Sequence, residues 1–375
     1  MIAAPGLGIR LLTLSGRRLL AAFAGMAVAV VVMFVELGLL LGILDSQAAM
    51  AGLIRSDLVV MNVDRTNLHK WDTLDRVRIS QIGGMEGVEA ALPVYQVPMG
   101  LKNPEDEAIR RIVVLAFPAR DVPLAIGDID EISAALSIPG NVLFDQLSRP
   151  IYSAIGVGQD IELDGAMHRV AGLVSIGPDI VNDGAVVMSE GTLLTRRPNA
   201  RPIMGAIRLI PGTDIAAARD RIQANLPDDV RVFTPNEVRW REIEFTLRSA
   251  PIGILFGIGM LAGLVIGSIT CYQILFNEIV DRLEQYATLK AMGFSEMFLR
   301  RVILEQSVLL SWGGFAVGLL FSWAVYSYIA DRTALLVQLS VFSVLTIFVL
   351  TNLMSVVAGQ LALRRVLTAD PAELY

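Results

Sequence analysis

Four long apolar segments constrain what this chain can fold into. They cover residues 19–44, 251–277, 302–330 and 339–361. Each exceeds the about 20 residues that a helix needs to cross a hydrocarbon core roughly 30 Å thick. The whole chain of 375 residues is 54% hydrophobic and only 18% charged, which is too apolar for an ordinary soluble enzyme of this length. We therefore expect an α-helical membrane protein with four transmembrane helices.

The first segment admits two interpretations. Arg17 and Arg18 precede it, and Ser46-Gln47-Ala48 resembles a signal-peptidase site. Its apolar stretch is much longer than the about 7–15 residues of a signal-peptide core. We interpret it as an uncleaved membrane anchor.

The distribution of Lys and Arg predicts the orientation, because cytoplasmic loops carry an excess of both. The segments richest in them among the short connections are 1–18, 278–301 and 362–375, whereas loop 331–338 holds only Arg332. We expect the first three to be cytoplasmic. Loop 331–338 and the large insert 45–250 would then lie on the periplasmic side.

Glycines recur at fourfold spacing in two of the segments. Gly259, Gly263 and Gly267 form one row, and Gly314 and Gly318 form another. Such small residues let helix backbones approach closely in lipid. They predict tight helix contacts within or between subunits, although glycine is also simply common in membrane helices.

Glu36 is the only ionisable residue within the first segment. A carboxylate at the bilayer centre costs roughly 2.5–3.5 kcal/mol on insertion scales, so such residues are often functional. Glu36 is a possible intramembrane polar site that contacts substrate or a proton. We favour the alternative of an interfacial glutamate that reaches the membrane surface or bonds a neighbouring helix.

The insert 45–250 has the pattern of a mixed α/β domain long enough to bury its own core. Asp164-Gly165 predicts a hairpin turn between strands at 159–163 and 167–174. Thr234-Pro235-Asn236-Glu237 predicts a helix start with a capping box. We expect that helix to continue into the second apolar segment as a nearly unbroken rod. Further strands are expected at 112–117, 185–188 and 203–210, and a helix at 214–226.

The sequence contains no pattern of catalytic or ligand-binding residues. His69 and His168 are isolated, and Cys271 is the single cysteine. The net charge of −6 argues against nucleic-acid binding. No Walker A motif occurs, so we expect any ATPase activity to reside in a separate chain. We therefore expect no enzyme activity, no cofactor and no metal.

The segment 278–301 carries the most specific signal. Apolar residues at spacings of three and four predict a short amphipathic helix at the cytoplasmic surface, ending at Gly293. A helix in this place is suited to contact with a soluble partner. The apolar residues are Ile279, Leu283, Tyr286, Leu289 and Met292.

The pattern Arg282-x-x-x-Tyr286-Ala-Thr-Leu-Lys-Ala-Met-Gly-Phe-Ser295 resembles the hallmark loop of FtsX-like/MacB-type ABC transporter permeases. The strings LEQY at 283–286 and CYQIL at 271–275 favour the DevC subfamily, the permease of DevBCA-type exporters. Segments 141–148 and 158–174 also resemble that subfamily. The resemblance extends over the whole chain and identifies 45–250 as a MacB-like periplasmic core domain.

This resemblance implies the permease subunit of an ABC-type tripartite export system in the bacterial inner membrane. The subunit would be a homodimer that couples ATP hydrolysis by a separate ABC ATP-binding subunit to periplasmic conformational change. Its further partners would be a membrane-fusion adaptor and an outer-membrane channel of the TolC type. The alternative is a non-transporting FtsX-like transducer that controls periplasmic cell-wall enzymes; the large outside domain favours export. The implied ATPase-coupling residues are Arg282, Glu284, Tyr286, Leu289, Lys290, Met292 and Gly293.

Overall fold

The chain forms two compact units, which we call the helix bundle and the α/β domain. The α/β domain comprises residues 43–250, and the helix bundle comprises residues 1–42 and 251–375. The computed structural model describes residues 16–65, 67–68, 72–179, 181–249, 251–283, 288, 292, 294–333 and 338–368.

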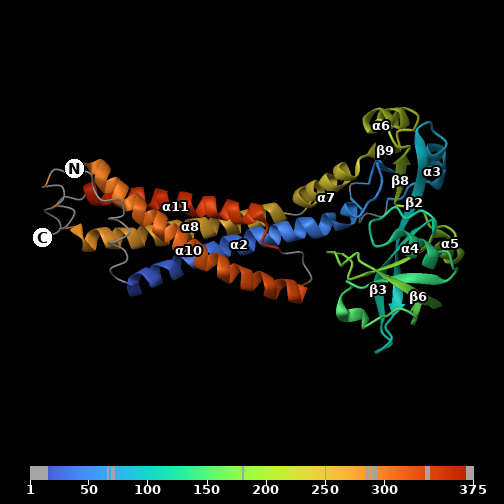
Figure 1. Ribbon diagram of the computed structural model, residues 1–375, viewed down its shortest axis with the longest axis horizontal. Coiled ribbons are helices and arrows are strands. Elements are labelled where there is room, and N and C mark those ends of the chain that lie inside the picture. The colour runs from blue at the N-terminus through green and yellow to red at the C-terminus, as the bar shows by residue number, and fades with distance from the viewer. Residues whose placement is uncertain are drawn as a thin grey trace. The chain divides into compact units, whose positions relative to one another are not determined.

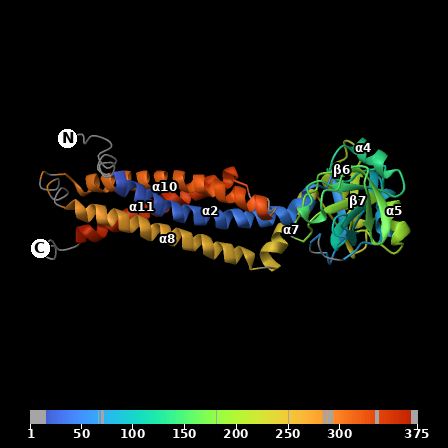
Figure 2. The same cartoon turned by 90° about the horizontal axis from the view of Figure 1, so that it is seen from below.

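The helix bundle contains four long helices that run side by side in both views (Figures 1 and 2). They are α2 (Gly16–Gly52), α8 (Ile252–Asp281), α10 (Glu296–Thr333) and α11 (Val341–Thr368). Each is long and apolar enough to cross a membrane. With the mixed α/β domain inserted after the first helix, this arrangement confirms the predicted fold class.

Two helix ends differ from the expectation. α2 continues past residue 44 to Gly52, since residues 45–51 contain neither proline nor glycine. α8 continues past residue 277 to Asp281, so Ile279 belongs to α8 and not to a separate cytoplasmic helix.

The nearly unbroken rod that was expected into the second apolar segment is interrupted before α8. Helix α7 (Pro235–Ser249) ends before α8 begins at Ile252. Pro251 caps α8, and proline lacks the amide hydrogen that a continuous helix requires.

The first lobe of the α/β domain has a ferredoxin-like arrangement of two β-α-β halves. Its strands lie in the order β9-β1-β8-β2, and helices α3 and α6 cover one sheet face through a core that includes Leu58, Val60, Ile79 and Ile222. On the other face, Val238 of α7 joins a core with Val59 and Met61 of β1. The elements are β1 (Leu58–Asn62), α3 (Arg76–Gly83), β2 (Val88–Lys102), β8 (Met204–Leu209), α6 (Ile215–Ala224) and β9 (Val230–Phe233).

The second lobe is a ring of six strands. Successive pairings β3-β7-β4-β6-β5-β2 are closed by β2 pairing with β3, and the ring encloses a core that includes Tyr95, Val114, Phe144 and Ile161. Strand β2 takes part in both lobes. The other elements are β3 (Ile109–Phe117), α4 (Ile129–Leu136), β4 (Asn141–Asp145), η1 (Pro150–Tyr152), β5 (Asp160–Leu163), β6 (Ala166–Val174), β7 (Ala185–Ser189) and α5 (Glu190–Arg196).

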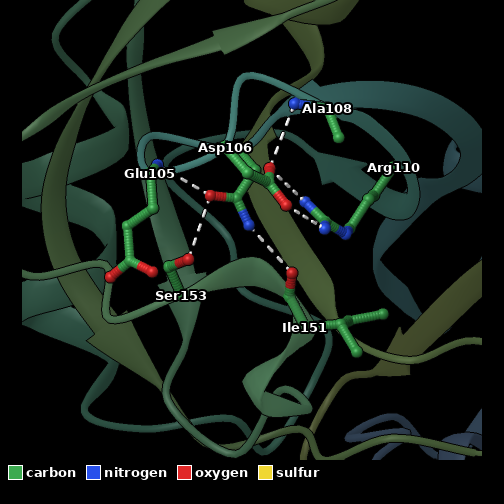
Figure 3. A network of polar contacts seen from close by, with 7 residues as sticks. Glu105, Asp106, Ala108, Arg110, Ile151 and Ser153 are labelled. Carbon is green, nitrogen blue, oxygen red and sulfur yellow. Dashed lines mark hydrogen bonds and ion pairs between the residues drawn. The ribbon is translucent and has the colours of Figure 1, made fainter.

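The turn between β2 and β3 is fixed by a polar network around Asn103 (Figure 3). The Asn103 side chain is buried, donates to Ile151 O at 2.9 Å and accepts from Ser153 Oγ at 2.9 Å. Beside it, the Arg110 guanidinium pairs with Asp106 and holds the pKa of that carboxyl at about 2. The hairpin tip is thereby attached to the η1 turn.

Both local motifs predicted for this domain are confirmed. Asp164 and Gly165 join β5 to β6 with φ values of 47° and 78°, as a tight hairpin turn requires. At the start of α7, Thr234 Oγ1 accepts from Glu237 N at 3.3 Å. Glu237 Oε2 in turn accepts from Thr234 N at 2.8 Å, which completes the capping box.

Candidate functional site in the helix bundle

Helix α2 is the most enclosed helix of the bundle. Of the residues in its most apolar stretch, 50% are buried, compared with 11% for the corresponding stretch of α8. Met26, Val30, Met33 and Phe34 of α2 are completely buried. Movement of a neighbouring helix must therefore displace side chains of α2.

Two glycines of α8, Gly263 and Gly267, lie against α2 and α11. A Cβ atom on Gly263 would lie 2.9 Å from Met33 Cγ. On Gly267 it would lie 2.7 Å from Met354 Sδ and 2.9 Å from Ala29 Cβ. These distances are shorter than van der Waals contact, so no larger residue fits at either position without displacement of its neighbours.

The glycines of α10 lie against the same central helix. A Cβ atom on Gly318 would be 2.6 Å from Val30 Cγ1, and one on Gly314 would collide with the Met26 side chain. A further close approach, which the glycine spacing did not predict, occurs at Gly38 of α2. There the Tyr326 hydroxyl of α10 occupies the space that a Cβ atom would need, and it donates to Phe34 O.

Glu36 points its carboxyl group at the backbone of α8. A side chain on Gly259 would overlap the Glu36 carboxylate, so this glycine provides the space for it. Glu36 is only partly buried. The structure thus places Glu36 and Gly259, which the sequence analysis singled out separately, at one contact.

The predicted coupling segment begins at the end of α8. Arg282 caps this helix, and its Nε lies 2.5 Å from Glu278 Oε1, with both side chains largely buried. Further on, Met292 is exposed. Five other predicted coupling residues lie outside the described residues: Glu284, Tyr286, Leu289, Lys290 and Gly293. The sequence analysis missed Glu278, which its spacing of four from Arg282 could have revealed.

A buried polar network in the α/β domain was also missed. The guanidinium of Arg65, which is 1% exposed, donates to the carbonyl oxygens of Leu68 and Asp72. Glu242 of α7, also 1% exposed, accepts from Leu68 N at 2.5 Å. Burial lowers the pKa of Arg65 to about 10 and raises the pKa of Glu242 to about 7. The network attaches Arg65 and Leu68 to α7.

Among the described residues, no cluster of His, Cys, Asp and Glu has the arrangement of a metal site. His168 is buried in the six-stranded ring, where its Nδ1 lies 3.2 Å from Gly140 O and burial lowers its pKa. His69 lies outside the described residues.

Residues 250–371, which include α8, α10 and α11, match the family described as FtsX-like permease C-terminal. This segment, about a third of the chain, is similar to that family. The match supports an ABC-type permease-like role for the chain. No curated protein sequence matches the chain.

Two solved structures are similar to part of the chain. The periplasmic region of MacB from Actinobacillus actinomycetemcomitans has 10% identity and a TM-score of 0.38, and the match covers 50% of this chain and 92% of that one. The extracellular domain of the noncanonic ABC-type transporter YknZ from Gram-positive bacteria has 13% identity and a TM-score of 0.34. That match covers 48% of this chain and 99% of that one.

Proposed function

We propose that this chain is the permease subunit of an ABC-type export system. It couples ATP hydrolysis by a separate subunit to a conformational change on the opposite side of the membrane. The observation that carries the proposal is the FtsX-like permease match over residues 250–371, in a chain that has no Walker A motif.

The segment between α8 and α10 is the proposed docking site for the ATP-binding subunit. The pair between Arg282 and Glu278 supports this role because it fixes the start of the segment to α8. The glycine contacts of α8 and α10 with α2 then provide a path into the bundle, since closely packed backbones move together.

The proposed assembly is a homodimer in the bacterial inner membrane. Lys and Arg in segments 1–18, 278–301 and 362–375 favour cytoplasmic placement of both termini and of the docking segment. The α/β domain would then face the periplasm, where a membrane-fusion adaptor and a TolC-type channel complete the export path. The DevC subfamily remains our proposal for the type of exporter.

The test uses the full chain reconstituted in nanodiscs with an ABC ATP-binding subunit from the same organism. Arg282→Glu combined with Gly293→Leu is expected to lower permease-stimulated ATP hydrolysis at least fivefold. Arg169→Glu is the matched control, because Arg169 is exposed in the α/β domain and its pair with Asp160 is long, at 3.8 Å. Unchanged stimulation in the double variant would contradict the docking site.

Export and signalling are separated by a second measurement on the same assembly. An exporter loses release of its cargo from cells when the coupling variant is introduced. An FtsX-like transducer instead loses activation of cell-wall hydrolases, with no change in released material. The second outcome would replace the export proposal by the signalling alternative.

A further inference from the structure

The outward face of α7 carries an apolar stripe between two arginines. Trp240 is 68% exposed and Leu247 is 43% exposed, and the half-buried Ile243 lies between them at helical spacing. Arg239 and Arg248 flank the stripe, and the side chains of both are mostly in solvent. The opposite face is buried in the domain through Val238, Glu242 and Thr246.

Chain connectivity keeps this helix near the membrane. α7 ends at Ser249, and α8, which is long and apolar enough to span a bilayer, begins at Ile252. Tryptophan favours the headgroup level of a bilayer, and arginine can extend its guanidinium toward lipid phosphates while its aliphatic part stays on apolar surface.

From these observations we propose that the face of α7 formed by Trp240, Ile243 and Leu247 binds the phospholipid surface, with Arg239 and Arg248 contacting lipid phosphates. An amphipathic helix with an apolar stripe and cationic edges lies in the plane of the interface. Arg239 pairs with Asp45 and Arg248 with Glu244, but these exposed pairs are weak and exchangeable.

A second protein is a less suitable occupant of this face. Three apolar side chains cover much less than the roughly 800 Å² per partner that a specific protein interface buries. Lipid needs no such area, because α8 already anchors the chain. The proposal concerns the α/β domain and is independent of the proposed export function.

α7 is long enough that a helix lying on the membrane surface can be distinguished from one standing upright on it. Trp240 lies nine residues before Ser249, which is roughly 13 Å along a helix axis. The headgroup region is only about 5–8 Å thick on each side of the hydrocarbon core. If α7 stood upright on the membrane, Leu247 alone would reach the headgroups. If α7 lies on the surface, all three positions reach them.

The experiment places one fluorescent label at a time on the full chain, in a Cys271→Ala background in nanodiscs with 30% phosphatidylglycerol. Trp240→Cys, Ile243→Cys and Leu247→Cys each receive an environment-sensitive label, and headgroup spin-labelled lipid is the quencher. Val77→Cys is the matched control, because Val77 is 56% exposed on α3, which covers the opposite face of the same sheet.

We expect all three positions on α7 to be quenched at least threefold more than position 77. Quenching at position 247 alone would show an upright helix and overturn the proposal. Quenching at none of the three would also overturn it, as would disulfide crosslinks between copies at position 240 without quenching. Arg239→Gln with Arg248→Gln should abolish the increase in quenching that phosphatidylglycerol gives over phosphatidylcholine, and a retained increase would remove the arginines from the proposal.

Discussion

In the helix bundle, the closest contacts are made at residues that have no side chain, whereas the α/β domain buries one of the longest side chains, that of Arg65. Gly263 and Gly318 allow their helices to approach α2 because any Cβ atom there would overlap a neighbour. Arg65 instead fills its site and satisfies two carbonyl oxygens. The packing of the bundle therefore depends on glycines, which have no side chain to separate the helices. The packing of the α/β domain depends on hydrogen-bond partners for its buried polar groups.

Loss of the buried guanidinium should have the largest effect. Arg65→Met removes the donors to Leu68 O and Asp72 O and leaves Glu242 buried without its neighbouring charge, so we expect a loss of about 3–5 kcal/mol in the free energy of unfolding at pH 8. Urea unfolding of the α/β domain, followed by pulse proteolysis, measures this. The control Arg169→Met, at an exposed side chain, should change the value by less than about 0.5 kcal/mol. Equal losses in both variants would show that the α/β domain does not depend on the hydrogen bonds of buried Arg65.

A larger residue at a helix contact should have the next largest effect. Gly263→Leu must displace Met33 and is expected to destabilise the bundle by about 1–3 kcal/mol, or more if the helices separate. Gly257→Leu is the matched control on the same helix, because nothing lies within 4 Å of its Cβ position. Hydrogen exchange of α2 and α8 in nanodiscs should rise only in the first variant. Equal exchange in both would show that the glycine row does not fix the packing.

The buried carboxyl should make the stability of the α/β domain depend on pH. The pKa of Glu242 is raised from 4.5 to about 7, so the Glu242 carboxylate binds a proton more tightly in the folded domain than in the unfolded chain. The contribution to stability is complete below pH 4.5 and is lost as the pH rises through 7. Relative to wild type, Glu242→Gln should gain about 2 kcal/mol between pH 5 and pH 8. Urea unfolding at both pH values tests this, and a constant difference would contradict it.

The smallest effect is expected at the start of α7. Thr234→Ala removes the acceptor for Glu237 N and should cost about 1 kcal/mol. Thr234→Ser retains the hydroxyl and serves as the control. Thermal unfolding of the α/β domain should show a lower midpoint for the alanine variant only. A similar decrease for serine would assign the effect to the lost methyl group and not to the cap.

Local signals accounted for much of the fold. The four spanning helices follow from apolar length alone, and the turn at Asp164-Gly165 and the cap at Thr234 follow from the requirements of single residues. Strand β2 was not predicted, because Pro93 and Pro98 lie within it and proline argues against a strand interior. In the structure, β2 includes both prolines and still pairs with β8 in one lobe and with β3 in the other.

The buried network was beyond sequence reasoning for a different reason. Leu68 and Glu242 are 174 residues apart, and no spacing rule connects them. Arg65 and Glu242 each resemble an ordinary surface charge in the sequence. Their burial becomes visible only when α7 is placed against Arg65 and Leu68. By contrast, the pairing of Gly259 with Glu36 joins two positions that the sequence had already marked, although separately.

The sharing of β2 between the two lobes shows that one lobe is inserted into the other. Val94 on β2 and Met204 on β8 are direct cross-strand neighbours, and Ile203 N donates to Val94 O at 2.8 Å. Everything from residue 95 to residue 203 is therefore an insertion at the tip of what would otherwise be a plain hairpin. The insertion also returns to the segment that follows α2, because Arg55 N donates to Pro123 O and Ala125 N donates to Leu53 O, both at 2.7 Å. A rearrangement of the ring can therefore reach the end of the first long helix directly, without passing through β2.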